Sequence, residues 1–302
     1  MNLTQTIRES RPELRESSLM VYENQINKLF RNVSRASTMR NLKFLNNYSK
    51  VENFLEKYKD TSKKGYLNAI IVAIKSTKHV GAPLERYEKL RDSLGKLYDE
   101  EQSSNIKNDK QEKWIPWSQF VEGISKLEGE LIDMKESNNL KDRIKYGDYI
   151  LLRLYQQLPV RNDFQNMEII HSDNIDSDSH NFLQIKNNEM NIILNYYKTS
   201  KTYGQQKIEI KDKLYDELLE YIHNTSVKHL LINEKTGYPM SSHDITMRLR
   251  RITNKLFGVK FGSNAIRHMY VSHKYANVTE MMKEDSKMML HSKSIQDNYI
   301  KF

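Results

Sequence analysis

The chain has 302 residues, of which 38% are hydrophobic and 29% charged, and its net charge is +9 at pH 7. These values predict a soluble, folded protein with enough residues for two domains. The absence of cysteine excludes disulfides, thiolate zinc sites and cysteine nucleophiles. No apolar run reaches the roughly 20 residues of a membrane span, and the polar start lacks the apolar core of a signal peptide, so we expect an intracellular protein with no membrane partner.

The positive charge is concentrated at the start of the chain. Residues 1–80 contain 15 Lys and Arg against 7 Asp and Glu, a balance of +8, whereas residues 121–302 contain 26 against 24, a balance of +2. A basic N-terminal region favours a polyanionic partner such as DNA. A solvated lysine-rich surface is the alternative interpretation of the same charge.

Helical spacing of apolar residues dominates residues 1–81. The first stripe consists of Leu19, Tyr22, Ile26 and Leu29, and Ser17 or Ser18 can cap its helix. Further helices are predicted over residues 51–58 and from Ser62 onward, where the stripe consists of Tyr66, Ala69, Ile70, Ala73 and Ile74. This pattern predicts a small helical bundle over residues 1–81. Residues 82–112 are charged and polar, which predicts an exposed helix leading into a flexible linker.

Residues 113–302 alternate between helical and strand patterns. Helices are predicted from Ser118 and over residues 144–157, the second ending before Pro159. Strands are predicted over residues 182–185, 190–197 and 206–210, the first two joined by a turn at Asn187 and Asn188. Helices follow over residues 213–223 and from a cap at Ser242 or Asp244 to Gly258. No internal repeat and no nucleotide-binding loop is present.

Several residues that can act on a phosphodiester are spread over this second region. Arg161 lies in Leu-Pro-Val-Arg-Asn-Asp-Phe, and Arg267 lies in Ser-Asn-Ala-Ile-Arg-His. His291 and Tyr299 follow near the end of the sequence, and Lys198 lies on the predicted hairpin. A tyrosine oxygen attacks phosphorus only when its proton is accepted or the phosphate is made more electrophilic by cations. Together these residues resemble the scattered signature of the tyrosine recombinase and integrase family, and the resemblance covers most of the chain.

The resemblance implies a fold that is mainly α with a small antiparallel β-sheet. It consists of an N-terminal helical core-binding domain (1–81), a linker (82–112) and an α+β catalytic domain (113–302). In that domain Arg161 and Arg267 match the two catalytic arginines, which bind the non-bridging oxygens of the scissile phosphate. Lys198 matches the lysine that protonates the leaving 5′ oxygen, and Lys201 is a close rival.

The last part of the signature implies the nucleophile and the class of reaction. His291 matches the histidine of the family's Leu-Gly-His segment, and Tyr299 matches the tyrosine that forms a 3′-phosphotyrosyl bond. The family reaction needs neither ATP nor a divalent metal, so no cofactor and no metal site are expected. His268 and His273 also lie five positions apart, a spacing that does not place them on one helical face.

The chain departs from the family pattern at three places. Asn264 stands where the family has a histidine, and an amide cannot take up a proton at ordinary pH, which leaves His268 and His291 as candidate bases. Asp163 lies one position before the place of the usual orienting acid, which is Phe164 here. Only residues 300–302 follow the tyrosine, whereas many relatives carry a further helix that packs on a neighbouring subunit.

These features predict a site-specific DNA recombinase or integrase of a mobile or viral element, acting as a homo-tetramer on double-stranded DNA. Predicted DNA contacts are Arg31, Arg35, Arg40, Lys63, Lys64, Lys201, Arg248, Arg250 and Arg251. A type IB topoisomerase uses nearly the same chemistry and is one alternative. A non-catalytic DNA-binding protein with a decayed site is the other, and it is motivated by Asn264 and by the short segment that follows Tyr299.

Overall fold

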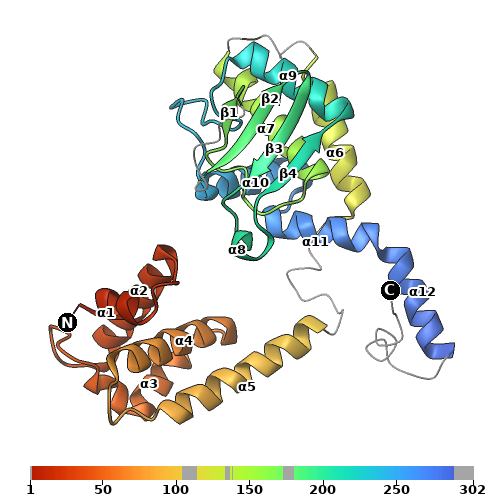
Figure 1. Ribbon diagram of the computed structural model, residues 1–302. Coiled ribbons are helices and arrows are strands. Elements are labelled where there is room, and N and C mark those ends of the chain that lie inside the picture. The colour runs from red at the N-terminus through yellow and green to blue at the C-terminus, as the bar shows by residue number, and fades with distance from the viewer. Residues whose placement is uncertain (1, 104–113, 133–136, 138, 173–179, 289–302) are drawn as a thin grey trace. The chain divides into compact units, whose positions relative to one another are not determined.

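The computed structural model describes residues 2–103, 114–132, 137, 139–172 and 180–288 (Figure 1). The chain divides into two compact units, Met1–Lys107 (unit 1) and Asn108–Phe302 (unit 2). Each unit has a hydrophobic core of its own. None of the described helices combines the length and the apolar composition of a membrane span.

Unit 1 is built from helices in its described part. They are α1 (Leu3–Ser10), α2 (Glu16–Val33), the 3₁₀ helix η1 (Lys43–Asn46), α3 (Tyr48–Leu55), α4 (Asp60–Thr77) and α5 (Leu84–Ser103). Helix α4 is central, with α1, α2 and α5 packed around it. Between Tyr66 and Ile74 nearly every residue of α4 is buried, as expected for a helix that is covered on all sides. The predicted stripe is therefore confirmed, and the buried surface is wider than the stripe.

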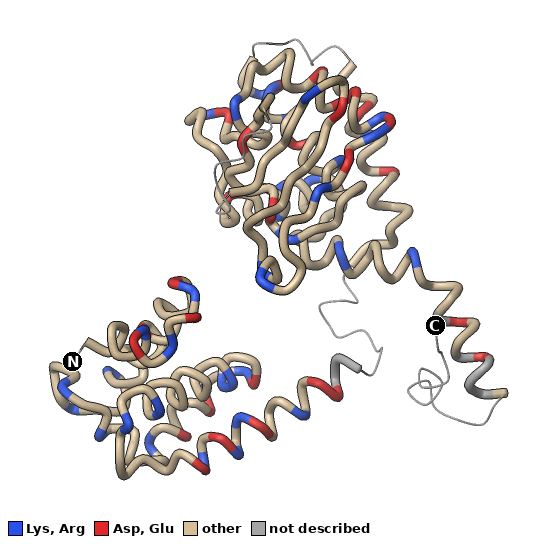
Figure 2. The backbone as a smooth tube through the Cα atoms, viewed as in Figure 1, with Lys and Arg blue, Asp and Glu red and all other residues tan. Residues whose placement is uncertain are grey.

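Helix α5 differs from the predicted linker. Its charged residues of both signs are visible along the helix in Figure 2, but Tyr87 is fully buried and Leu94 is 9% exposed in the core of unit 1. The Tyr87 hydroxyl also donates a hydrogen bond of 2.7 Å to the carbonyl oxygen of Leu45. Residues 84–103 therefore belong to the first unit, because one face of this polar helix supplies core side chains.

Unit 2 combines helices with one sheet. Its helices are α6 (Trp117–Gly129), α7 (Leu140–Gln157), α8 (Ser200–Tyr203), α9 (Asp212–Thr225), α10 (Ser242–Phe257), α11 (Ser263–Lys274) and α12 (Ala276–Met288). Its strands are β1 (Glu168–Ile170), β2 (Asn181–Lys186), β3 (Glu189–Leu194) and β4 (Gln206–Ile210), which lie in the order β1-β2-β3-β4. Alternate residues of β3, namely Met190, Ile192 and Leu194, belong to the core that α7, α9 and α10 share.

The predicted hairpin of β2 and β3 is confirmed. Its turn residues Asn187 and Asn188 have φ angles of 52° and 62°, the left-handed conformation that a two-residue turn requires and that asparagine tolerates. Strand β3 ends at Leu194 rather than at Tyr197. The reason is that the backbone N–H groups of Asn195 and Tyr196 bind the Asn181 side chain instead of a neighbouring strand.

The predicted fold class is also confirmed, since a helical unit precedes an α+β unit with a small sheet. The sheet is mixed, because β1 pairs with β2 in parallel while the other pairs are antiparallel. A strand of three residues is too short to show alternation in a sequence. Helix α10 is capped by Ser241, one residue before the predicted Ser242, through reciprocal bonds between Ser241 and Asp244.

Candidate active site

Arg161 lies on a short segment after α7 whose backbone is fixed by buried hydrogen bonds. The Tyr155 hydroxyl on α7 lies 3.0 Å from the Arg161 carbonyl oxygen and 3.0 Å from Asn162 Oδ1, and these two acceptors share its single hydrogen. The Asn162 amide in turn donates to α10, at 2.8 Å to the carbonyl oxygen of Ser242 and at 2.7 Å to Thr246 Oγ1. The Arg161 side chain remains exposed. The segment therefore presents this guanidinium from a rigid base.

The same tyrosine connects this segment to α11, the helix that carries Arg267. Tyr155 is fully buried, and its ring packs edge-on against Phe164 with centroids 5.3 Å apart. Burial raises the pKa of Tyr155, and a hydrogen bond from Ser263, the first residue of α11, opposes that rise. One buried hydroxyl thus contacts both chain segments that carry the predicted catalytic arginines.

Helix α11 is anchored by its apolar face, formed by Ala265, Ile266 and Met269. Arg267 is half-buried, while Asn264 and His268 are exposed. The His268 ring packs against Trp114 with centroids 5.1 Å apart and planes tilted by 34°. This contact gives His268 a packing role, so it is a weaker candidate for the base than the sequence suggested.

Asp163 is the feature that relates the two arginines electrostatically. Burial raises the pKa of its carboxyl, while a hydrogen bond from the Arg161 backbone and the positive charges of Arg161 and Arg267 lower it. Within the described residues, neither guanidinium forms an ion pair with a carboxylate. Both positive charges thus act on one half-buried carboxylate, and in the described part of the chain the side-chain donors of the two guanidiniums are not engaged by an ion pair.

Asp163→Asn is expected to leave unit 2 as stable as the wild type at pH 7, or more stable. The pKa of Asp163 is higher in the folded protein than in the unfolded chain. Protonation of this carboxyl therefore contributes its full stabilisation at a pH below the unfolded-state pKa, and this stabilisation is lost as the pH rises through the folded-state pKa. The ionised carboxylate therefore costs stability at pH 7, and asparagine removes this cost. Urea unfolding at pH 7 and at about pH 4 measures the effect. A variant less stable than the wild type at pH 7 would contradict it.

Asn181 joins the Arg161 segment to the connection that carries the lysines. It is 4% exposed at the start of β2, and its amide donates to the carbonyl oxygens of Asp163 (2.8 Å) and Tyr196 (2.9 Å). Its Oδ1 accepts from the backbone N–H groups of Asn195 and Tyr196. Every hydrogen-bonding position of this side chain is therefore used to hold two segments together.

The predicted lysines lie beyond this clamp, in residues 195–205 between β3 and β4. Lys198 occupies a turn and Lys201 lies on α8, and both side chains are exposed. The Tyr197 hydroxyl closes the base of the connection with a 2.7 Å bond to the Gly204 carbonyl oxygen. The lysines thus lie on the connection between the antiparallel strands β3 and β4, and this connection contains the short helix α8.

Arg248 is a correction among the predicted DNA contacts. Its side chain is 6% exposed and pairs with Asp148 and Glu234, both at 2.7 Å. Gly147 packs so closely here that a Cβ atom would lie 2.2 Å from Glu234 Oε1. Arg248 is therefore part of the interior of unit 2 and is not available to a phosphate.

The other predicted DNA contacts differ in their exposure and in whether another side chain already engages them. Arg31, Arg35, Arg40, Lys201, Arg250 and Arg251 are exposed. Arg251 also pairs with Asp148 at 2.7 Å. Lys63 and Lys64 are half-buried, the first paired with Asp60 at 3.1 Å and the second lying over the Tyr98 ring at 5.5 Å.

His291 and Tyr299 lie outside the described residues, so their predicted roles remain predictions. Among the residues that are described, no three His, Asp or Glu side chains are arranged to hold a metal ion. The sequence analysis did not identify Tyr155, Asn162 and Asn181 as residues that position the site. Of these, only Asn162 could have been suspected, because it directly follows Arg161 in the sequence.

Comparison with known proteins gives a limited likeness. No protein-family model matches the sequence, and no curated protein matches it. The XerA recombinase structure matches over 100% of this chain and 93% of its own, with a TM-score of 0.34 and 10% identity. The XerH site-specific recombinase bound to its difH substrate matches over 99% of this chain and 94% of its own, with a TM-score of 0.43 and 14% identity. At these values the likeness assigns no role to any residue, and the roles proposed below rest on the geometry of this chain.

Proposed function

We propose that the chain is a site-specific DNA recombinase or integrase that cleaves and rejoins strands of double-stranded DNA through a 3′-phosphotyrosyl intermediate. The observation that supports this most strongly is that Arg161 and Arg267, which come from distant parts of the sequence, both lie close enough to Asp163 for their positive charges to lower the pKa of its carboxyl. Two guanidiniums that form no ion pair with any described residue suit a phosphodiester, because each can bind non-bridging oxygens bidentately.

In the proposed reaction the Tyr299 hydroxyl attacks phosphorus and gives its proton to a base, for which His291 is the stronger candidate and His268 the weaker, and the bond from phosphorus to the 5′ oxygen breaks. Arg161 and Arg267 stabilise the charge that accumulates on the five-coordinate phosphate. Lys198 or Lys201 gives its proton to the departing 5′ oxygen, while His291 hydrogen-bonds the phosphate. Attack by the 5′-hydroxyl of another strand reverses the step, so the chemistry needs neither ATP nor a metal ion. Exchange between two duplexes requires four active sites, which a homo-tetramer supplies.

A trapping experiment with duplexes of randomised sequence tests this function. The full chain is incubated with a nicked pool, and complexes that survive boiling in detergent are isolated and digested. We expect a covalent DNA adduct on the peptide that contains Tyr299. Binding without any adduct would favour a non-catalytic DNA-binding protein. Processive relaxation of supercoiled plasmid without recombination sites would favour a topoisomerase.

A further inference from the structure

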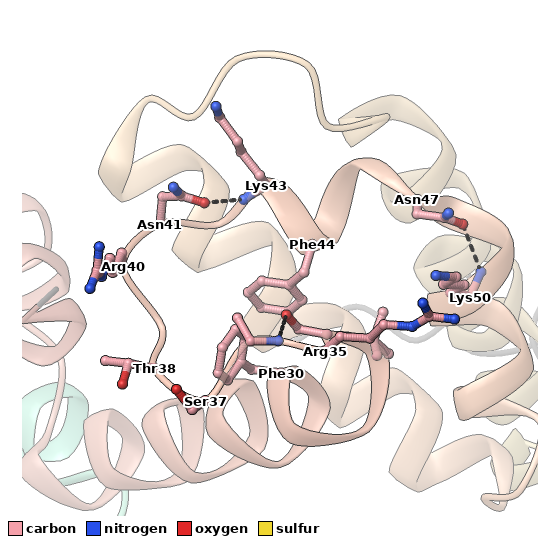
Figure 3. Close-up of a pocket in the computed structure, with 13 residues that line it drawn as sticks. Phe30, Arg35, Ser37, Thr38, Arg40, Asn41, Lys43, Phe44, Asn47 and Lys50 are labelled. Carbon is pink, nitrogen blue, oxygen red and sulfur yellow. Dashed lines mark hydrogen bonds between the residues drawn. The ribbon is translucent and has the colours of Figure 1, made fainter.

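The connection between α2 and α3 in unit 1 is strongly basic and lacks acidic residues. No Asp or Glu occurs from residue 24 to residue 51, and the basic residues of this stretch are Lys28, Arg31, Arg35, Arg40, Lys43 and Lys50. The end of α2, the connection and the start of α3 line a pocket of 660 Å³ (Figure 3). Four of these cations line it, and no carboxylate does.

The cations surround the pocket without neutralising partners. Figure 3 shows the Arg35 side chain extending toward Lys50, while Arg40 lies at the opposite end. Within the described part of the chain, Arg35, Arg40, Lys43 and Lys50 form no ion pair. Like charges held around a concave surface raise the local positive potential and favour an anionic ligand.

The pocket is held in shape by local contacts. The rings of Phe30 and Phe44 pack edge-on with centroids 5.3 Å apart. The side-chain oxygens of Asn41 and Asn47 accept backbone hydrogen bonds of 3.0 Å from Lys43 and 3.1 Å from Lys50. A ligand therefore meets a preformed surface, which lowers the entropic cost of binding.

A second hollow continues the basic surface. It has a volume of 540 Å³, shares Lys43 and Asn47 with the first, and includes Arg86, whose guanidinium lies 4.2 Å from the centre of the Tyr48 ring. No acidic residue lines either hollow. The cations thus follow an extended track, which suits a polymer of phosphates better than a single ion.

We propose that this track, defined by Arg35, Arg40, Lys43 and Lys50, binds the sugar–phosphate backbone of double-stranded DNA, an inference that rests on the function proposed above. A single-stranded ligand is disfavoured because few ring faces are open for bases to stack on: Phe30 is 7% exposed, and the Arg86 guanidinium covers a face of the Tyr48 ring. The track supplies charge and neutral donors such as Asn41, which position a duplex without reading its sequence. Lys63 and Lys64 on α4 are excluded from the track because Asp60 and Tyr98 engage them.

The test compares two full-length variants that lose the same charge. In the track variant Arg35, Arg40, Lys43 and Lys50 are all replaced by glutamine, and in the control variant Lys57, Lys59, Lys89 and Lys96, which are exposed elsewhere on unit 1, are replaced likewise. Affinity for several duplexes is measured by fluorescence anisotropy over a salt series. For the track variant we expect the slope of log affinity against log salt to shrink by about 3–4 and all sequences to be weakened alike. The control should change the slope by less than half as much.

Two further measurements keep the proposal open to refutation. The pairwise variants Arg35→Gln with Lys50→Gln, and Arg40→Gln with Lys43→Gln, should each lower the slope by about 2 even if the fourfold variant folds poorly. A salt slope that is the same in the variants as in the wild type would overturn the proposal. The proposal would also fail if the wild type bound inorganic phosphate saturably and the track variant did not, while the DNA salt slope of the track variant stayed at the wild-type value. The slope reports noncovalent binding only, so a chain that forms no Tyr299 adduct but shows the expected slopes would refute the proposed catalysis and not the track.

Discussion

Arg267→Ala is expected to slow formation of the covalent protein–DNA product by about 10²–10³-fold, the usual cost of removing one preorganised donor to a developing charge. The positive charges of Arg267 and Arg161 both lower the pKa of the Asp163 carboxyl. In the proposed reaction the two arginines share the role of neutralising the phosphate. Noncovalent binding of the same duplex should persist, because contacts elsewhere supply most of it. Single-turnover kinetics on duplexes recovered from the randomised pool measures the change. Arg161→Ala should slow the reaction by a similar factor. The double variant should be slowed by less than the product of the two single factors, because the two arginines act together.

The matched control is Lys274→Ala, which removes an exposed cation from the same helix. Its rate should stay near the wild-type rate. Arg267→Lys should give an intermediate rate, because an ammonium keeps the charge and loses the bidentate geometry. If Arg267→Ala reacts at the wild-type rate, or if Lys274→Ala is equally slow, the assigned role of Arg267 is wrong.

Arg248→Ala is expected to lower the free energy of unfolding of unit 2 by about 3–5 kcal/mol, because it leaves buried carboxylates without their partner. The guanidinium is 6% exposed and binds Asp148, Glu234 and the carbonyl oxygen of Ile144, the last at 2.9 Å. The cost arises from the carboxylates that remain, whose burial is no longer compensated. Urea denaturation followed separately for the two units measures it, and the transition of unit 1 should not move, since each unit has its own core.

Arg250→Ala supplies the comparison on the same helix. Arg250 is exposed, and exposed substitutions usually change stability by at most ~0.5 kcal/mol. If both variants lost similar stability, general weakening of α10 would explain the result better than the buried ion pairs. A change below ~1 kcal/mol for Arg248→Ala would show that the buried network contributes little.

The elements that the sequence predicted well are those with a local cause. The stripe of α4 follows from apolar residues at helical spacing, and the β2–β3 turn follows from two asparagines that tolerate positive φ angles. Helix α5 was assigned to a linker because its charged residues hide the few apolar ones, such as Tyr87, that reach the core. Composition averages over a helix, whereas burial depends on one face of it.

The site was predictable only in part for a similar reason. Arg161 and Arg267 were named from their motifs, and the structure relates them through Asp163. Asn181 could not be named, because its partners Asp163 and Tyr196 are 18 and 15 residues away and no local pattern records the contact. Arg248 was wrongly predicted to contact DNA, because no local sequence pattern indicates that it pairs with Asp148, which is 100 residues earlier.

The bond between Tyr197 and Gly204 separates the root of the β3–β4 connection from its tip. Because Asn181 fixes the root on one side and β4 begins at Gln206 on the other, residues 198–203 form an insert bounded by two fixed points. Replacing only residues 198–203 with a segment of another length or sequence would therefore change the tip of the connection, including both candidate lysines. The sheet below would keep its register. A change in the reactive tip can thus be made within six consecutive residues, without changing the strands on either side.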